Sequence, residues 1–563
     1  MRNVTADMLA LSCLYRWEKT MPGRIALTQP MGAGVVSDFT WAEVANQSRR
    51  MASHLKAQGW EAGSKVAILS KNCAWWLMSD LAIWMAGYVS VPLYPTLAHS
   101  TIAQILAHSG ARACFIGKLD GWERMKPGVP TGLPCISFPV SPGDAIASYD
   151  AWDATCARNS PLEGDPMRAA EEIATIIYTS GTTGLPKGVM HSFGSFAWAV
   201  DRGIVRISIT STDRMLSYLP LAHVVERVLV EHGWLRTGMH VFFSDTLETF
   251  AADIRRARPT IFFSVPRLWL KFQHAVLREL PPARLERLLS IPLVGGLVRR
   301  KVLKTLGLDR CRIAAGGAAP MPVELLAWYR SIGLPINEGY GLTENLAVSH
   351  LTLPGHNQQG TVGPTYDGVD CRIDPTSGEI QMRSGALMLG YYQDPTLTRE
   401  AFTADGWLRT GDIGEIDEHG LLRVTGRLKD LFKTSKGKYV APAPIEDRLV
   451  MHEAVDACIV TGANLSQPLA IVILTAEATA RVADPQKKAA LEASLVQHLD
   501  EVNRTLDPHE RLECIVVASL AWTVDNDIIT PTFKVKRNRI EEIYGRDCAR
   551  WEASGRKVIW QAG

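Results

Sequence analysis

The chain has 563 residues, more than one hydrophobic core supports, so we expect at least two domains. Hydrophobic residues make up 47% and charged residues 21%, which excludes a disordered chain. The formal net charge of +2 gives no indication of nucleic-acid binding. The ten cysteines form no Cys-x-x-Cys pair, so neither a disulfide framework nor a zinc site is predicted. Asp7 interrupts the first apolar stretch, a poor match to a signal peptide, and we expect a cytoplasmic protein.

Apolar segments in the first 120 residues alternate between strand-like and helix-like patterns. We predict strands at 65–70, 89–93 and 113–116 and helices at 75–86 and 102–108. The most hydrophobic window, 74–94, has Asp80 in its middle and prolines near its end. A spanning helix needs roughly 20 apolar residues with few charges, so we interpret this window as a buried helix followed by a buried strand. The alternation predicts an α/β fold containing parallel sheet.

The segment 173–188, IATIIYTSGTTGLPKG, joins a β-branched strand to a loop of small and hydroxyl-bearing residues. Such loops expose several backbone N–H groups and can enclose an anion, so we predict a polyphosphate site. The spacing differs from a Walker loop, in which Gly-Lys is followed by Ser or Thr. No Gly-x-Gly-x-x-Gly dinucleotide fingerprint follows a strand either. The loop residues that would contact the phosphates are Thr179, Ser180, Gly181, Thr182, Thr183, Gly184 and Lys187.

Two further buried strands are predicted at 216–219 and 261–265, with YLPLAHVVER following the first. His223 and Glu226 of this segment are three residues apart, but a metal site would need a second pair that the sequence lacks. The segment 255–304 interleaves arginine with leucine and tryptophan. This pattern is typical of amphipathic surface helices with snorkelling arginines. Peripheral contact with an anionic membrane is the alternative.

Four more motifs follow. A strand at 311–315 runs into GGAAPMP, where Gly317 and Ala318 would let the backbone approach a ligand and Pro322 is placed to start a helix. The motifs beyond it are EGYGLTE at 338–344, TGD at 410–412, GRLKD at 426–430 and TPTFKVKR at 530–537. The composition and the pattern of the sequence change after Asp412, and we place a domain boundary near 426–429.

The loop at 173–188 and these motifs occur in the order found in the adenylate-forming superfamily, which the chain resembles. That superfamily comprises acyl-CoA synthetases, firefly-type luciferases and peptide-synthetase adenylation domains. The resemblance implies a large N-terminal domain of βα layers with mixed sheets, residues 1–426, which binds AMP and the acyl group. A small C-terminal α+β domain, residues 427–563, would carry the catalytic lysine and rotate about Lys429. Phe533 before the lysine and the LPLAH segment are most similar to bacterial long-chain acyl-CoA synthetases.

The resemblance also implies roles for single residues. Lys534 would stabilise charge that grows during adenylation. Glu344 would hold Mg²⁺ and Thr343 would bond the α-phosphate, while His223 would lie near the acyl carboxylate. The ATP site would comprise the loop residues above together with Gly317, Ala318, Glu338, Gly339, Tyr340, Gly341, Asp412, Arg427 and Lys429.

The predicted reaction is the ATP-dependent activation of a medium- or long-chain fatty acid, followed by transfer of the acyl group to CoA. The alternatives are an acyl-AMP ligase that loads a carrier protein, a ligase for an aryl or other carboxylic acid, and a binding protein that has lost catalysis. The lysines of 433–438 would meet the CoA phosphates or form a solvated charge run. We expect no nucleic-acid partner. Peripheral contact at the inner face of the membrane stays open, as do chain length and oligomeric state.

Overall fold

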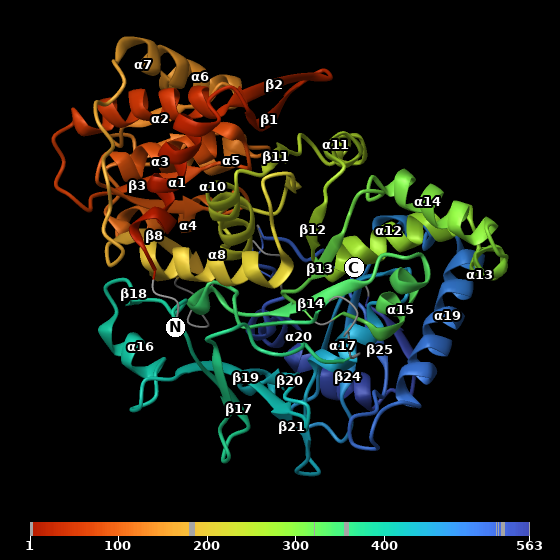
Figure 1. Ribbon diagram of the computed structural model, residues 1–563. Coiled ribbons are helices and arrows are strands. Elements are labelled where there is room, and N and C mark those ends of the chain that lie inside the picture. Colours follow the sequence, from red (N-terminus) through yellow and green to blue (C-terminus); the bar gives the residue numbers. More distant parts are fainter. Residues whose placement is uncertain are drawn as a thin grey trace.

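The computed structural model describes residues 4–179, 186–319, 321–353, 360–524, 526, 528–530 and 535–561. A large part built from four sheets is followed, beyond residue 430, by a smaller part with one four-stranded sheet (Figure 1). The predicted fold class is therefore confirmed. The division at residues 426 and 427 stays a prediction.

The largest sheet has eight strands in the order β18-β9-β8-β4-β3-β5-β6-β7. Its strands from β8 to β7 run parallel, whereas β9 pairs antiparallel with β8 and β18 pairs antiparallel with β9, so the sheet is mixed. The bounds are β3 (Lys65–Leu69), β4 (Val89–Leu93), β5 (Ala113–Ile116), β6 (Cys135–Ser137), β7 (Asp150–Ala151), β8 (Ile173–Thr179), β9 (Lys187–Ser192) and β18 (Gly390–Tyr391).

Alternate side chains of these strands enter two separate cores. Val66 and Ile68 of β3 pack in one core, and Ala67 and Leu69 pack in the other, as expected for a strand buried on both faces. The first core includes residues of α2 (Trp41–Lys56), α3 (Ala74–Met85) and α8 (Phe193–Ile207). The second includes residues of α4 (His99–Ser109) and α5 (Trp122–Met125). The predicted alternation of strands and helices is thus confirmed.

The hydrophobic window 74–94 forms α3 and β4, as predicted. Asp80 of α3 is fully buried and pairs with the equally buried Arg227. Arg227 begins a π-helical turn, Arg227–His232, and also lies 3.2 Å from Glu231. A buried carboxylate is tolerated here because a guanidinium lies beside it. Among the helices that the structure describes, none is both long and apolar enough to cross a membrane.

The large part also contains two four-stranded sheets, in the orders β10-β11-β1-β2 and β12-β13-β14-β15. The strand predicted at 216–219 lies two residues earlier, because Tyr218 and Leu219 already belong to the following loop. The strands are β1 (Ile25–Gly32), β2 (Val35–Thr40), β10 (Arg214–Ser217), β11 (His240–Phe243), β12 (Ile261–Ser264), β13 (Ile313–Gly316), β14 (Ile336–Tyr340) and β15 (His350–Leu351). The helices beside them are α11 (Phe250–Ala257), α12 (Pro266–Glu279), α13 (Pro282–Ser290), α14 (Val294–Leu306) and α15 (Val323–Ser331).

An antiparallel sheet, β16-β17-β19-β20, leads to the C-terminal part. Its strands are β16 (Asp370–Ile373), β17 (Glu379–Arg383), β19 (Leu408–Ile416) and β20 (Leu422–Arg427), and a 3-10 turn, Leu428–Asp430, follows. The smaller elements of the whole chain are α1 (Ala10–Thr20), α6 (Gly143–Ser148), α7 (Trp152–Arg158), α9 (Val224–Glu226), α10 (Gly233–Thr237), α16 (Pro395–Glu400), α18 (Ala476–Arg481), β21 (Phe432–Lys433) and β22 (Tyr439–Val440).

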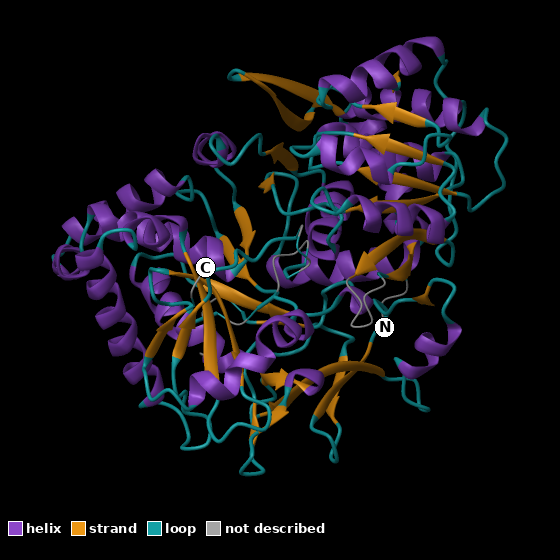
Figure 2. Cartoon of the chain, turned by 180° about the vertical axis from the view of Figure 1, so that it is seen from behind, coloured by secondary structure: helices purple, strands orange, loops and turns teal. Residues whose placement is uncertain are grey.

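The C-terminal sheet is β23 (Val455–Thr461), β24 (Leu469–Leu474), β25 (Ile515–Val517) and β26 (Val558–Trp560). One face packs on α17 (Ala443–Leu449) and α19 (Pro485–Asn503), and the other packs on α20 (Arg537–Glu552), as Figure 2 shows from behind. The part therefore has its own core on each side of its sheet.

Candidate active site

A buried carboxylate lies where three strands converge. Asp412 of β19 stands opposite Arg427 of β20 in the strand register. Its Oδ1 accepts a hydrogen bond of 2.8 Å from Arg427 Nε, and its Oδ2 accepts one of 2.7 Å from the hydroxyl of Tyr340, at the end of β14. Burial and the Asp412 charge raise the pKa of Tyr340, so its hydroxyl keeps its proton. A carboxylate has about four lone-pair positions, so Asp412 can accept further donors from a ligand.

The Thr-Gly-Asp turn fixes the direction of Asp412. Gly411 has a φ of +71°, a left-handed conformation that favours glycine. Its N–H donates to Glu379 Oε1 at 2.9 Å. The Thr410 hydroxyl donates to the carbonyl of Ile380 at 2.7 Å and accepts from the N–H of Asp412 at 3.1 Å. The carboxylate is therefore held by local hydrogen bonds as well as by its ion pair.

Glu344 and Lys187 come together around one tyrosine. The hydroxyl of Tyr391 donates to Glu344 Oε1 at 2.8 Å, and Lys187 Nζ lies 5.6 Å from the centre of the Tyr391 ring. Tyr391 is in place because β18 pairs with β9, the strand that begins at Lys187. Met388 N–H donates to the backbone carbonyl of Glu344 at 2.8 Å. The carboxylate predicted to bind a metal and the cation of the phosphate loop thus share one neighbourhood.

The turn that carries Thr343 is fixed by a buried histidine. His191 Nε2 lies 2.7 Å from the carbonyl oxygen of Thr343 and must donate, because a carbonyl only accepts. Burial lowers the pKa of His191 to about 4, so the ring is neutral at pH 7. Asn345 Oδ1 accepts from the N–H of Leu342 at 2.8 Å and closes the turn.

The ends of β13 and β14 approach each other closely. Gly316 stands opposite Glu338, and a Cβ on Gly317 would lie 2.8 Å from the carbonyl oxygen of Gly339. Ala318 has a φ of +67°, which is strained for a residue with a side chain. Burial raises the pKa of Glu338 to about 7. Backbone strain of this kind gathers at ligand sites. The role of these residues in binding a ligand stays a prediction.

Gly341 makes a second close approach in this motif. A Cβ at Gly341 would lie 2.5 Å from the backbone carbonyl carbon of Ala347. The chain can therefore turn back after Tyr340 only because residue 341 is glycine.

His223 caps α9, and its Nδ1 accepts from the N–H of Val225 at 3.3 Å. The buried Glu226 holds the loop that carries it, accepting from Ser217 Oγ at 2.8 Å and from Asn72 Nδ2 at 3.1 Å. Burial raises the pKa of Glu226 to about 8. Within the described residues, no three His, Cys, Asp or Glu side chains gather as a metal site.

Lys429 is exposed in the 3-10 turn between β20 and the C-terminal part. Next to it, Asp430 lies 3.6 Å from Arg537 at the start of α20. The remaining predicted residues, which lie outside the described residues, are Ser180, Gly181, Thr182, Thr183, Gly184 and Lys534. Thr179 ends β8 opposite Lys187, so both ends of the phosphate loop are anchored in one sheet.

Three residues of this neighbourhood were not indicated by the sequence: Tyr391, His191 and Asn72. Tyr391 and His191 act on predicted residues from distant parts of the chain, 47 positions away for Glu344 and 152 for Thr343. Asn72 bonds Glu226, in the segment that carries His223, from 154 positions away. No local pattern marks such partners. The pairing of β18 with β9 would have been needed to find Tyr391.

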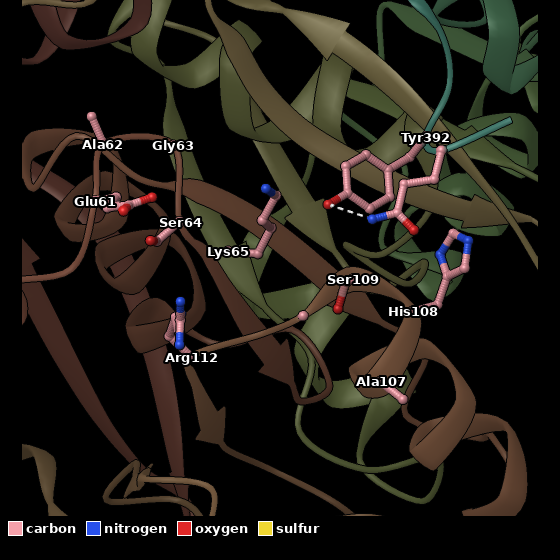
Figure 3. A pocket seen from close by; sticks show the side chains of 12 residues that line it. Glu61, Ala62, Gly63, Ser64, Lys65, Ala107, His108, Ser109, Arg112 and Tyr392 are labelled. Atoms are coloured by element: carbon pink, nitrogen blue, oxygen red, sulfur yellow. Dashed lines mark hydrogen bonds between the residues drawn. The ribbon is translucent and has the colours of Figure 1, made fainter. Parts of the chain in front are cut away.

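A polar pocket of about 340 Å³ has Tyr392, the neighbour of Tyr391, in its lining (Figure 3). Its lining includes Lys65, His108, Arg112 and Tyr392, none of which was predicted for the site. His108 Nδ1 lies 2.8 Å from the hydroxyl of Tyr178, in the strand before the phosphate loop. We assign this pocket no chemistry.

The fold is that of the adenylate-forming enzymes. One similar structure is the A domain of a carboxylic acid reductase from Segniliparus rugosus, solved with AMP and a co-purified carboxylic acid. It has a TM-score of 0.80 and 22% identity, and covers 98% of this chain and 94% of that one. An anthranilate CoA ligase solved with anthranoyl-AMP has a TM-score of 0.75 and 21% identity, and covers 95% and 97%.

The chain belongs to the AMP-binding enzyme family. The pattern of that family matches residues 14–392, and the pattern of the AMP-binding enzyme C-terminal domain matches residues 429–550. A long-chain-fatty-acid–CoA ligase of Mycobacterium bovis is 31% identical over 91% of this chain and 92% of its own length. The peroxisomal long chain acyl-CoA synthetase 6 of Arabidopsis thaliana is 29% identical over 91% of this chain and 81% of its own length.

Proposed function

We propose that this protein is a fatty acid–CoA ligase that activates a medium- or long-chain acid with ATP and transfers the acyl group to CoA. The observation that carries the proposal is the set of contacts Tyr340–Asp412–Arg427 and Glu344–Tyr391–Lys187 around the ends of β9, β14 and β19. Relatives with about 30% identity along most of the chain are named as ligases of long-chain fatty acids and CoA. Both facts support the same reaction.

In the first half-reaction the acid's carboxylate attacks the α-phosphorus of ATP, giving acyl-AMP and pyrophosphate. Asp412 would accept hydrogen bonds from both ribose hydroxyls, while Arg427 and Tyr340 keep its carboxylate in position. Lys187 and Thr343 would contact the phosphates. Lys534 would bind the attacking carboxylate and stabilise the charge that grows on the bridging oxygens in the transition state. No covalent bond to the enzyme is needed, so these side chains position reactants and balance charge.

The carboxylate of Glu344 is a suitable ligand for Mg²⁺. Mg²⁺ in ATP sites is usually held by one or two carboxylates together with phosphate oxygens and water. Glu344 offers one carboxylate, and Tyr391 bonds only its Oε1. The ion would neutralise phosphate charge when bound. Glu344 itself is kept in direction by Tyr391 and by the turn that His191 fixes.

In the second half-reaction the CoA thiol attacks the acyl carbon and AMP leaves. We propose that the C-terminal part, residues 427–563, first rotates about Lys429, which removes Lys534 and admits the pantetheine chain. Of the lysines of 433–438, Lys433 ends β21, where its Nζ lies 5.6 Å from the Tyr439 ring, and the other two lie in the turn between β21 and β22. Their charge would suit the phosphates of CoA.

The test is an acid panel with purified protein. Pyrophosphate exchange is measured with saturated fatty acids, benzoates and amino acids, and thioester formation is measured with free CoA and with acyl carrier protein. We expect exchange with fatty acids and thioester with free CoA. Exchange with no fatty acid would overturn the substrate, and transfer only to the carrier protein would make the enzyme an acyl-AMP ligase.

We also propose a cytoplasmic protein that takes up its acid at a membrane surface without spanning the bilayer. Long-chain acids partition into lipid, which supports this proposal. The acid's hydrocarbon tail must leave the bilayer before its carboxylate can reach Asp412 and Glu344.

A further inference from the structure

The tip of the α13–α14 hairpin exposes a group of apolar side chains. Leu293 is 90% exposed, Leu297 69%, Ile291 42% and Val294 36%. Single exposed apolar residues are ordinary on protein surfaces, but four within seven positions at one tip are not. The hairpin lies at the outer edge of the molecule in both views (Figures 1 and 2).

Leu293 is held outward by a strained backbone. Its φ is +66° and its ψ is −47°, and the N–H of Val294 donates to the carbonyl of Pro292 at 2.8 Å across it. This is a γ-turn of the positive-φ kind, which is rare and costly for a residue with a side chain. The turn stays in place because Gly295 lies against the backbone of Leu289, where a Cβ would meet the carbonyl oxygen at 2.4 Å.

The hairpin is strongly basic. Residues 282–306 contain six arginines and lysines and one glutamate, a net charge of +5 against +2 for the whole chain. The rest of the chain is therefore slightly acidic. All six cations are exposed: Arg284, Arg287, Arg299, Arg300, Lys301 and Lys304.

Apolar and basic residues share one face of α14. Arg300 and Lys301 lie three and four positions after Leu297, and Lys304 lies four and three positions after them, so all four lie on one side of the helix. Val302 faces away from this side, into the core beneath the hairpin. Cations with long stems beside leucines can reach lipid phosphates while the leucines enter the acyl region.

We propose that this tip docks on an anionic lipid bilayer, with Ile291, Leu293, Val294 and Leu297 in the interface and the basic side chains on lipid phosphates. The charge complementarity selects this occupant, since a nucleic acid would leave the leucines without an apolar partner. The proposed function explains why such docking would be useful, because it would deliver a lipid-soluble acid to the enzyme, and the proposal rests on it in this respect only. Vesicle binding itself needs no catalysis.

The first test is co-sedimentation with vesicles of phosphatidylcholine, with and without phosphatidylglycerol, using the full chain. We expect binding to the anionic vesicles only, weakened by salt because the contact is electrostatic. The double variant Leu293→Gly, Leu297→Gln should bind about tenfold more weakly, as two leucines no longer enter the interface. Leu293→Gly also relieves the positive φ, so it should not lower the unfolding temperature.

Leu247→Gly provides the matched control, since Leu247 is 87% exposed on a different loop. Its binding to vesicles should equal that of the wild type. Hydrogen exchange in the wild type should slow in residues 290–297 when anionic vesicles are added, a readout that needs no variant.

Three results would overturn the proposal: no wild-type binding to anionic vesicles, equal binding by the double variant, or unchanged exchange at 290–297. A double variant that instead turns a dimer into a monomer would show that a second copy covers the tip. Activity on a water-soluble acid such as octanoate, without vesicles, tests the proposed function separately. That activity should be the same in the wild type and in all of these variants.

Discussion

At the scale of single residues, Asp412 is the group on which most of the candidate site depends. It joins β14 to β19 and β20, because its two oxygens accept hydrogen bonds from Tyr340 and Arg427. We predict that Asp412→Asn raises the KM for ATP by about 10- to 100-fold, because hydrogen bonds to a charged group contribute about 1.5–3 kcal/mol. Pyrophosphate exchange at varied ATP measures this change.

Tyr340→Phe is a milder variant whose KM for ATP is compared with that of Asp412→Asn. It removes one donor to Asp412 and leaves the ion pair with Arg427 intact, so the KM for ATP should rise less than in Asp412→Asn. Equal effects of the two substitutions would contradict the assignment of ribose binding to the carboxylate.

Glu338 makes folding stability depend on pH. Its pKa in the folded state is about 7, above the ordinary value of 4.5, so the folded chain holds this proton more tightly than the unfolded chain. The stabilisation is therefore full below about pH 4.5 and is lost as pH rises through about 7. We predict that Glu338→Gln gains up to about 3 kcal/mol relative to wild type between pH 5 and pH 8.

Denaturant unfolding of both proteins across that range measures the difference in free energy. A difference between variant and wild type that stays constant from pH 5 to pH 8 would mean that Glu338 is ionised throughout.

At the scale of elements, the approach of β13 to β14 shapes the predicted nucleotide turn. We predict that Gly317→Ala raises the KM for ATP at least about fivefold and destabilises the fold by about 1–3 kcal/mol, because the new Cβ would press on the backbone of Gly339. Gly316→Ala is the control, since its Cβ would meet the flexible Met321 side chain at 3.2 Å. Equal losses in both variants would point to general damage to the sheet.

The same scale shows what the sequence could and could not predict. The strand at 65–70 was predictable because Val66, Ala67, Ile68 and Leu69 are all apolar, as burial on both faces requires. The pairing of β18 with β9 was not, because a two-residue strand has no periodicity and its partner lies 200 positions away. Tyr340 and Asp412 could be named from their motifs, and the structure joins them by a hydrogen bond, whereas Tyr391 and His191 depend on long-range pairing.

At the scale of the molecule, few charged contacts join the two parts. Arg267 of α12 pairs with Asp456 of β23, and Arg278 lies 4.0 Å from Glu477 of α18. Both pairs are substantially exposed, and exposed pairs contribute about 0–1 kcal/mol. Ion pairs this weak would let the C-terminal part move relative to the rest, as the proposed two-step reaction requires, if the packing of Met451 against the core of α12, α14 and α15 is also released.

The turn Leu428–Asp430 provides the sharpest test of that motion. A 3-10 turn has φ near about −50 to −70°, which suits proline, so Lys429→Pro should keep the present arrangement and hinder others. We predict that the ratio of pyrophosphate exchange to thioester formation changes at least about tenfold, because only one half-reaction uses this arrangement. Lys429→Ala, which leaves the backbone free, should change the ratio less than about threefold. If proline slowed both half-reactions equally, residue 429 would not be the hinge and the two steps would share one domain arrangement.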